Sequence, residues 1–124
     1  MSLSSGKMFA TIAVKDLEVA KKFYGGKLGL NQTDQSPDDG LMYNSAIGQL
    51  FVYTSSTAGT NQATCASWKV NNIESEVNDL KTKGITFEHY DIPGATWEGD
   101  ISVMGSLKAA WFKDPDGNIL GINN

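Results

Sequence analysis

The sequence predicts an α+β domain built from two successive units, each made of a strand, a helix and three further strands. Two observations support this prediction. A strand that leads into a capped helix occurs twice, 56 residues apart, at Val14 and again at Val70. A turn between two strand-like runs also occurs twice, 69 residues apart, at Gly48 and at Gly117. Because the same elements recur in the same order, we expect an internal repeat.

The first unit opens with residues 9–14, whose alternating side chains predict a half-buried strand. Asp16 stands where a helix N-cap belongs, and apolar residues follow it at helical spacing. The Gly-Gly pair at 25–26 is expected to end this helix. Further strands are expected at residues 41–44 and 49–54.

The second unit repeats this order. Residues 64–70 predict a strand, and Asn71 and Asn72 supply the cap of a helix that Gly84 is expected to end. By alternation, Trp68 is assigned to the core beneath this helix. Further strands are expected at residues 86–91, 107–113 and 118–122.

The longer spacing of the turns requires 13 extra residues in the second unit. They fall mostly in residues 92–106, a segment expected to be a long loop, and loops of this length often serve as lids or binding loops. The single domain, residues 1–124, is expected to consist of modules at about 8–57 and 63–124. Residues 1–7 are expected to be a disordered leader, or one added for expression.

Composition excludes several classes of partner. The formal net charge of −4, with scattered Lys and Arg, gives no attraction for nucleic acid. No window approaches the roughly 20 apolar residues of a membrane span, so no membrane partner is expected. The single cysteine, Cys65, excludes an internal disulfide, and a cytoplasmic location fits best.

Four motifs, in this order and spacing, resemble the vicinal oxygen chelate superfamily, which includes glyoxalase I, bleomycin-resistance proteins and extradiol dioxygenases. The resemblance runs from about Phe9 to Ile122. The motifs are VKDL at 14–17, FY at 23–24, LGL at 28–30 and WFKDPDGN at 111–118.

The resemblance implies two βαβββ modules whose curled mixed sheets surround a shared cleft, with the helices outside. Metal-dependent members hold a divalent ion with His, Glu, His and Glu, two from each module. Members that resemble the drug-binding branch sequester their ligand and commonly form homodimers. A homodimer is therefore expected here.

The family's metal ligands have no counterpart in this sequence. Their positions fall on Phe9 and Val52 in the first module, and on Cys65 and Gly121 in the second. Phe, Val and Gly offer no side-chain donor to a hard cation, and one thiol cannot hold such an ion alone. We therefore expect no metal and no cofactor.

The leading hypothesis is a protein with a metal-free cleft for a small apolar or aromatic ligand. Trp97 has two equally weighted interpretations, closing the cleft over a ligand or packing on a sheet edge or second subunit. Trp111 and Phe112 point in opposite directions, so one of them belongs to the core. The expected ligand-binding residues are Phe9, Thr11, Val52, Cys65, Ser67, Trp97 and Gly121.

The alternative hypothesis is a glyoxalase-like lyase, isomerase or dioxygenase with non-standard metal ligands. Its candidate groups are His89, Glu98, Asp100 and Cys65, although no spacing unites them. The only histidine, His89, is interpreted as a surface strand residue with no evident partner. No residue is therefore assigned a catalytic role. A third hypothesis is a structural or regulatory dimer whose cleft has no ligand.

Overall fold

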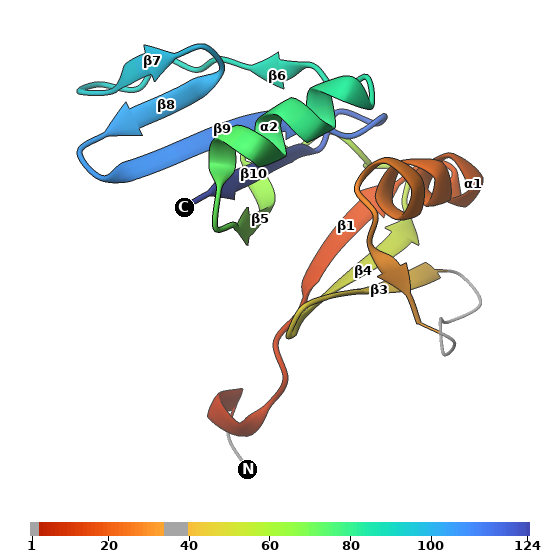
Figure 1. Ribbon diagram of the computed structural model, residues 1–124. Helices are drawn as coiled ribbons and strands as arrows, with labels where there is room; N and C mark the ends of the chain where they lie inside the picture. Colours follow the sequence, from red (N-terminus) through yellow and green to blue (C-terminus); the bar gives the residue numbers. More distant parts are fainter. Residues whose placement is uncertain (1–2, 34–39) are drawn as a thin grey trace. The chain divides into compact units, whose positions relative to one another are not determined.

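The computed structural model describes residues 3–33 and 40–124. The chain divides into two compact units, Met1–Ala58 and Gly59–Asn124, each of which contains a mixed sheet and helical segments (Figure 1). This confirms the predicted α+β class. In the described part of the chain, no helix is long and apolar enough to cross a membrane.

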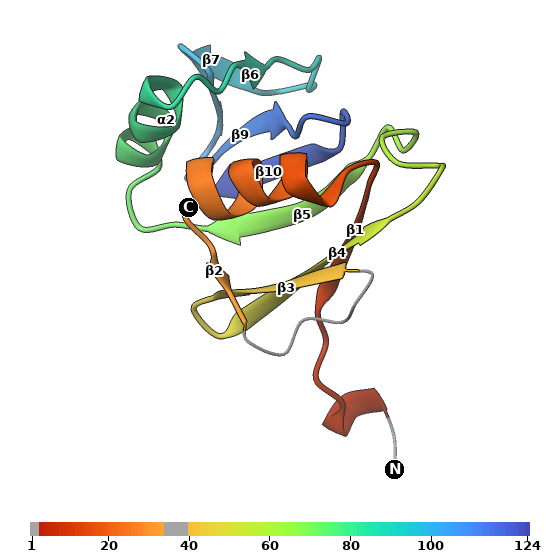
Figure 2. The same cartoon turned by 90° about the vertical axis from the view of Figure 1, so that its right-hand side faces the viewer.

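Unit 1 has the predicted order of strand, helix and three strands. Its sheet has the order β1-β4-β3-β2, in which β1 and β4 run parallel and the other neighbours antiparallel (Figure 2). A short 3₁₀ turn, η1 (Leu3–Ser5), precedes it. The elements are β1 (Ala10–Val14), α1 (Leu17–Ala20), the π-helical η2 (Lys21–Lys27), β2 (Asn31–Gln32), β3 (Gly40–Ser45) and β4 (Gly48–Thr54).

The first helix starts where predicted but ends later. The Asp16 carboxylate accepts hydrogen bonds from the amides of Glu18 at 2.8 Å and Val19 at 3.4 Å. The prediction that Gly25 and Gly26 end the helix is wrong, because the chain continues as η2 through both. A Cβ on Gly25 would lie 3.6 Å from the Tyr43 ring, so its lack of a side chain serves close packing rather than helix termination.

Unit 2 has the same order with one addition. Its sheet has the order β5-β10-β9-β8-β7, and β6 also pairs with β9. The helix α2 lies across β9 and β10 (Figure 1). The elements are β5 (Thr64–Lys69), α2 (Ile73–Thr82), β6 (Phe87–Glu88), β7 (Thr96–Glu98), β8 (Ile101–Met104), β9 (Leu107–Lys113) and β10 (Ile119–Asn123).

Local sequence accounts for the ends of α2. The Asn72 side chain accepts a hydrogen bond from the amide of Ser75 at 3.0 Å. Gly84 follows the helix at a φ of 88°, in the left-handed region that glycine adopts at low cost. Both predicted ends are therefore confirmed.

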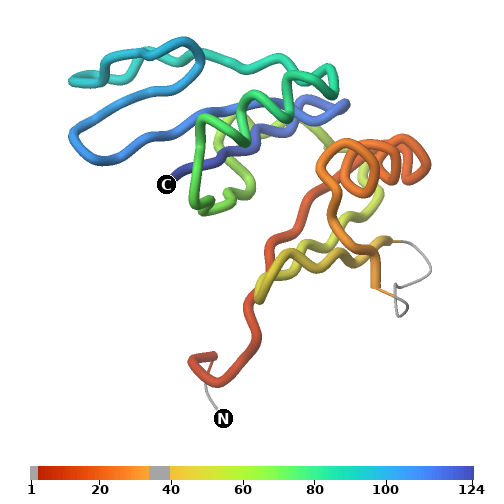
Figure 3. Tube along the Cα trace, viewed as in Figure 1, coloured from red at the N-terminus to blue at the C-terminus, as the bar shows by residue number. Residues whose placement is uncertain are grey.

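The prediction of a long loop at 92–106 is wrong. Residues 96–104 form a hairpin in which β7 and β8 pair antiparallel, and β8 pairs in turn with β9 (Figure 3). The apolar residues Trp97, Ile101 and Val103 lie in two short strands on either side of a Gly99 turn with a φ of 63°. The addition therefore extends the sheet by one hairpin.

The terminal turn of unit 2 is one residue longer than its counterpart. Ala46 and Ile47 separate the paired ends of β3 and β4. In unit 2, three residues separate Asp114 from Asn118, whose carbonyl accepts the Asp114 amide at 2.9 Å. The buried Asp114 carboxylate holds this turn by accepting the Asn118 amide at 2.8 Å.

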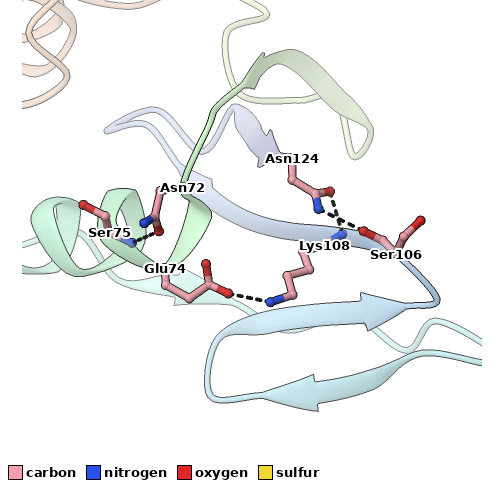
Figure 4. A network of polar contacts seen from close by, with 6 residues as sticks. All are labelled: Asn72, Glu74, Ser75, Ser106, Lys108 and Asn124. Atoms are coloured by element: carbon pink, nitrogen blue, oxygen red, sulfur yellow. Dashed lines mark hydrogen bonds and ion pairs between the residues drawn. The ribbon is translucent and has the colours of Figure 1, made fainter.

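A polar network joins the start of α2 to the ends of β9 and β10 (Figure 4). The Lys108 ammonium donates to the Glu74 carboxylate at 2.6 Å, and this hydrogen bond is the main cause that lowers the pKa of Glu74. The Asn124 side chain accepts the Lys108 amide and donates to the Ser106 carbonyl, each at 2.9 Å. These contacts hold the second sheet and its helix together at one end.

Candidate functional site

Four aromatic rings form a continuous row in unit 2, which we call the ring row: Tyr90, Trp111, Trp97 and His89. Tyr90 meets Trp111 edge to face, with centroids 5.8 Å apart at 76°. Trp111 and Trp97 are tilted at 60° with centroids 6.3 Å apart. His89 stacks on Trp97 at 4.4 Å and 8°. Three segments that are separate in the sequence therefore share one aromatic surface.

Strand register explains why the two tryptophans share a face. Trp97 pairs with Ser102, which pairs with Ala109, two residues before Trp111 on β9. Side chains at these positions point to the same side of the sheet, which we call the open face of unit 2. Both indoles are half-buried and accessible to a ligand.

The opposite face of this sheet is the core, and it resolves the question of Trp111 and Phe112. Phe112 is only 1% exposed and lies on the side that packs against α2, together with the buried Ala110. Trp68 also lies on this side, because it pairs with the buried Ile122, although its side chain is only half-buried. Trp111 is therefore the member of the pair that faces outward.

Gly121 provides space for Trp111. The two residues are paired across β10 and β9, and a Cβ on Gly121 would lie 3.3 Å from the indole Cδ1 and Nε1. The same Cβ would lie 3.2 Å from the Ser67 hydroxyl oxygen. The indole thus lies over the glycine, at the position where the family resemblance places an acidic ligand.

His89 has a partner that sequence analysis missed. Its Nε2 lies 2.7 Å from Asp100 Oδ1, and the ammonium of Lys81 from α2 forms an ion pair with Asp100 Oδ2. The hydrogen bonds from Lys81 and then His89 hold the pKa of Asp100 below its usual range. Asp100 lies in the turn between β7 and β8, so the unpredicted hairpin brings it to His89.

Tyr90 closes the other end of the ring row. Its hydroxyl is buried and has no hydrogen-bond partner among the described residues. Burial, with a smaller contribution from the charge of Glu88, raises the pKa of this phenol. A buried hydroxyl without a partner costs on the order of 1–3 kcal/mol, which a polar atom of a ligand could offset.

Cys65 and Ser67 lie on β5, two residues apart. Cys65 is half-buried, and its thiol lies 3.7 Å from the Ala63 carbonyl. Ser67 is exposed and pairs with Gly121, next to Trp111. Ser67 is therefore the β5 residue nearest to the ring row, and a ligand contact for either residue remains a prediction.

Unit 1 also has an open face, which carries Thr11, Phe51 and Tyr53. Phe51 pairs with Thr11 and stacks on Tyr53, with ring centroids 5.8 Å apart. Phe9, just before β1, is 45% exposed. The structure thus leaves Phe9 and Thr11 accessible, and their ligand-binding role remains a prediction.

The prediction that Val52 lies on this open face is wrong. Val52 pairs with Ile12, and both belong to the core, with 0% and 1% exposure. The error comes from the longer turn of unit 2, which places Gly121 opposite Phe51 in the repeat, 70 residues away rather than 69. A shift of one residue moves a strand side chain to the other face of its sheet.

The residues present do not fit the metal that the family resemblance implies. With the observed register, the four ligand positions fall on Phe9, Phe51, Cys65 and Gly121. Three of these lack any side-chain donor atom, and Trp111 covers the fourth, Gly121, from above. Among the described residues, no three His, Cys, Asp or Glu side chains gather closely enough to hold a metal ion.

Comparison with known proteins identifies the family. The family model for the Glyoxalase/Bleomycin resistance protein/Dioxygenase superfamily matches residues 8–122. The chain belongs to this superfamily. This confirms the resemblance in the sequence, and no significant match to a curated protein was found.

Solved structures of the glyoxalase superfamily share the fold at low sequence identity. The fosfomycin resistance protein FosX from Listeria monocytogenes, in a hexagonal crystal form, is 15% identical over 96% of this chain and 92% of its own, with a TM-score of 0.71. An integron cassette protein from the Halifax Harbour sewage outfall metagenome is 20% identical over 96% and 97%, with a TM-score of 0.69. A lactoylglutathione lyase from Agrobacterium tumefaciens is 15% identical over 96% and 92%, also at 0.69.

Proposed function

We propose that this chain binds a small, largely apolar or aromatic molecule on the ring row of unit 2, without a metal ion. The observation that supports this most is the pair of half-buried indoles, Trp97 and Trp111, on the open face of the sheet. Stacked or edge-to-face aromatic contacts contribute about 0.5–1.5 kcal/mol each beyond area burial. A planar ligand in contact with both indoles would gain several such contacts.

Gly121 supports the metal-free part of this proposal. An acidic side chain there would collide with Ser67 and with the Trp111 ring, so the same strand position cannot hold both the ligand of a metal and this indole. The exchange replaces a charged group by an aromatic surface. It favours apolar ligands over the oxygen-rich substrates that a hard cation would bind.

Tryptophan fluorescence tests the binding proposal. We expect saturable quenching by at least one compound of a panel of dyes, antibiotics and aromatic metabolites. Trp97→Ala and Trp111→Ala should each weaken binding by about tenfold or more, since each removes a stacking surface. Trp68→Phe is the matched control, because Trp68 lies on the opposite face of the sheet, and it should leave affinity unchanged.

Two results would overturn the binding proposal. One is a panel without any saturable binder. The other is a binder whose affinity is unchanged in both Trp97→Ala and Trp111→Ala, which would place its site elsewhere.

The enzymatic alternative is separated by metal content. Plasma mass spectrometry of untagged protein, purified without chelators, should find less than about a tenth of an equivalent of divalent metal. Close to one equivalent of Ni, Zn, Mn or Fe would instead favour a lyase, isomerase or dioxygenase with non-standard ligands. The homodimer implied by the family remains a prediction, which sedimentation velocity can test.

A further inference from the structure

The strongest unassigned feature is the pair formed by His89 and Asp100 at the end of the ring row. The two residues come from different segments, and Nε2 lies 2.7 Å from Oδ1. The imidazole is about half exposed, with a side-chain exposure of 48%. It also lies flat on Trp97 and is therefore part of the proposed ligand surface.

The carboxylate determines which imidazole nitrogen carries the hydrogen. Asp100 is held ionised by its ion pair with Lys81, and an ionised carboxylate can only accept hydrogen bonds. The neutral imidazole must therefore donate from Nε2. Its Nδ1 is then left as an acceptor, and stacking on Trp97 fixes the plane in which that acceptor lies.

Charge around the pair is balanced for one further anion. Lys81 from α2 and Asp100 from the turn between β7 and β8 cancel each other. A proton taken up by His89 adds a positive charge beside this ion pair. A ligand that gives up a proton to His89 supplies the matching negative charge, so no charge is left without a partner.

From these contacts we propose that His89, oriented by Asp100, selects aromatic ligands that carry an acidic hydroxyl group, that is, phenols. The proposal rests on the proposed function, because the ligand ring must lie on the ring row. The phenol O–H donates to Nδ1. Where the proton transfers, the O–H bond breaks, its electron pair stays on oxygen and the Nδ1 lone pair binds the proton, leaving a phenolate beside an imidazolium.

Para-nitrophenol and para-nitroanisole test this proposal as a matched pair. The two probes share the same nitroaromatic ring, and the anisole lacks the hydroxyl hydrogen. Affinity is measured for both by quenching of tryptophan fluorescence. Below the pH at which free para-nitrophenol ionises, the yellow colour of its phenolate reports proton transfer directly.

We expect the phenol to bind about tenfold more tightly than the anisole, which corresponds to one charge-assisted hydrogen bond. His89→Phe keeps a ring on Trp97 but has no Nδ1, so it should bind both probes equally. Asp100→Asn removes the carboxylate that fixes the hydrogen on Nε2 and should also abolish the preference. Asp91→Asn is the charge-matched control, because Asp91 is exposed and two residues from His89, and it should retain the preference.

The outcomes separate this proposal from the proposed function. Equal binding of the two probes to the unmodified protein overturns the phenol selectivity and leaves the aromatic site intact. A preference that survives in His89→Phe also overturns it, and the anisole affinity of that variant shows whether the ring row is still folded. Absence of binding by either probe overturns the selectivity together with the aromatic site for this class of ligand.

Discussion

The two units place an aromatic ring over a glycine on their open faces, but only one of them builds a larger surface around it. In unit 1 the Phe51 ring lies over Gly40 and stacks on Tyr53. In unit 2 the Trp111 ring lies over Gly121, and two further residues, Trp97 and Tyr90, extend the contact. The same local device therefore serves packing in one unit and a candidate binding site in the other.

The difference arises from the hairpin of β7 and β8. It supplies Trp97 to the ring row and Asp100 to His89, and unit 1 has no equivalent strands among its described residues. A repeated module can thus gain a site by inserting one hairpin at a sheet edge, without a change in its core. This comparison makes three predictions about the roles of the aromatic rings, the glycines and Asp100.

The largest effect is expected for the two neighbouring aromatics of β9. Phe112→Ala should lower the free energy of unfolding by about 3–5 kcal/mol, because it opens a cavity in the core. Trp111→Ala should lower it by only about 1–2 kcal/mol, since this ring is half-buried. Urea unfolding measures both, and a larger loss for Trp111 would show that the open face is part of the core.

The two glycines should differ next. A Cβ on Gly40 would lie 2.9 Å from the Val52 carbonyl oxygen and 2.5 Å from the Phe51 ring, so Gly40→Ala should cost about 1–3 kcal/mol. A Cβ on Gly121 meets only side chains, at 3.2–3.3 Å, and Gly121→Ala should cost less than about 1 kcal/mol. Thermal unfolding of both variants tests this ranking, and equal losses would contradict it.

The smallest effect concerns acid stability. The folded pKa of Asp100 is lowered, chiefly by Lys81 and then by His89, so its contribution is fully present above the unfolded pKa near 4. It is lost as the pH falls through the folded pKa. Because the pair is near the surface, Asp100→Asn should cost less than about 1 kcal/mol at pH 7, and this difference should shrink in acid.

Urea titrations from neutral to acidic pH measure the acid effect, with Asp91→Asn as the control for a simple change of charge. A difference between Asp100→Asn and the unmodified protein that grows in acid would contradict the assigned pairing. A difference that Asp91→Asn reproduces would assign the effect to net charge.

Sequence predicted the elements whose causes lie within a few residues. The caps at Asp16 and Asn72, the Gly84 stop and the Asp114 turn all depend on hydrogen bonds or backbone angles of near neighbours. The hairpin of β7 and β8 was missed because its strands are short and bounded by weak signals. The end of the first helix was missed because packing against Tyr43, rather than helix termination, accounts for Gly25.

The sequence by itself determined the repeated order of elements, the family and the absence of the family's metal-ligand types, since all three depend on residue types and local spacing. Only the tertiary structure decided which side chains meet. One extra residue in a turn moved Val52 from the open face to the core. Strand pairing brought His89 to Asp100 and Trp97 to Trp111, because contacts between separate strands depend on register, which local sequence does not determine.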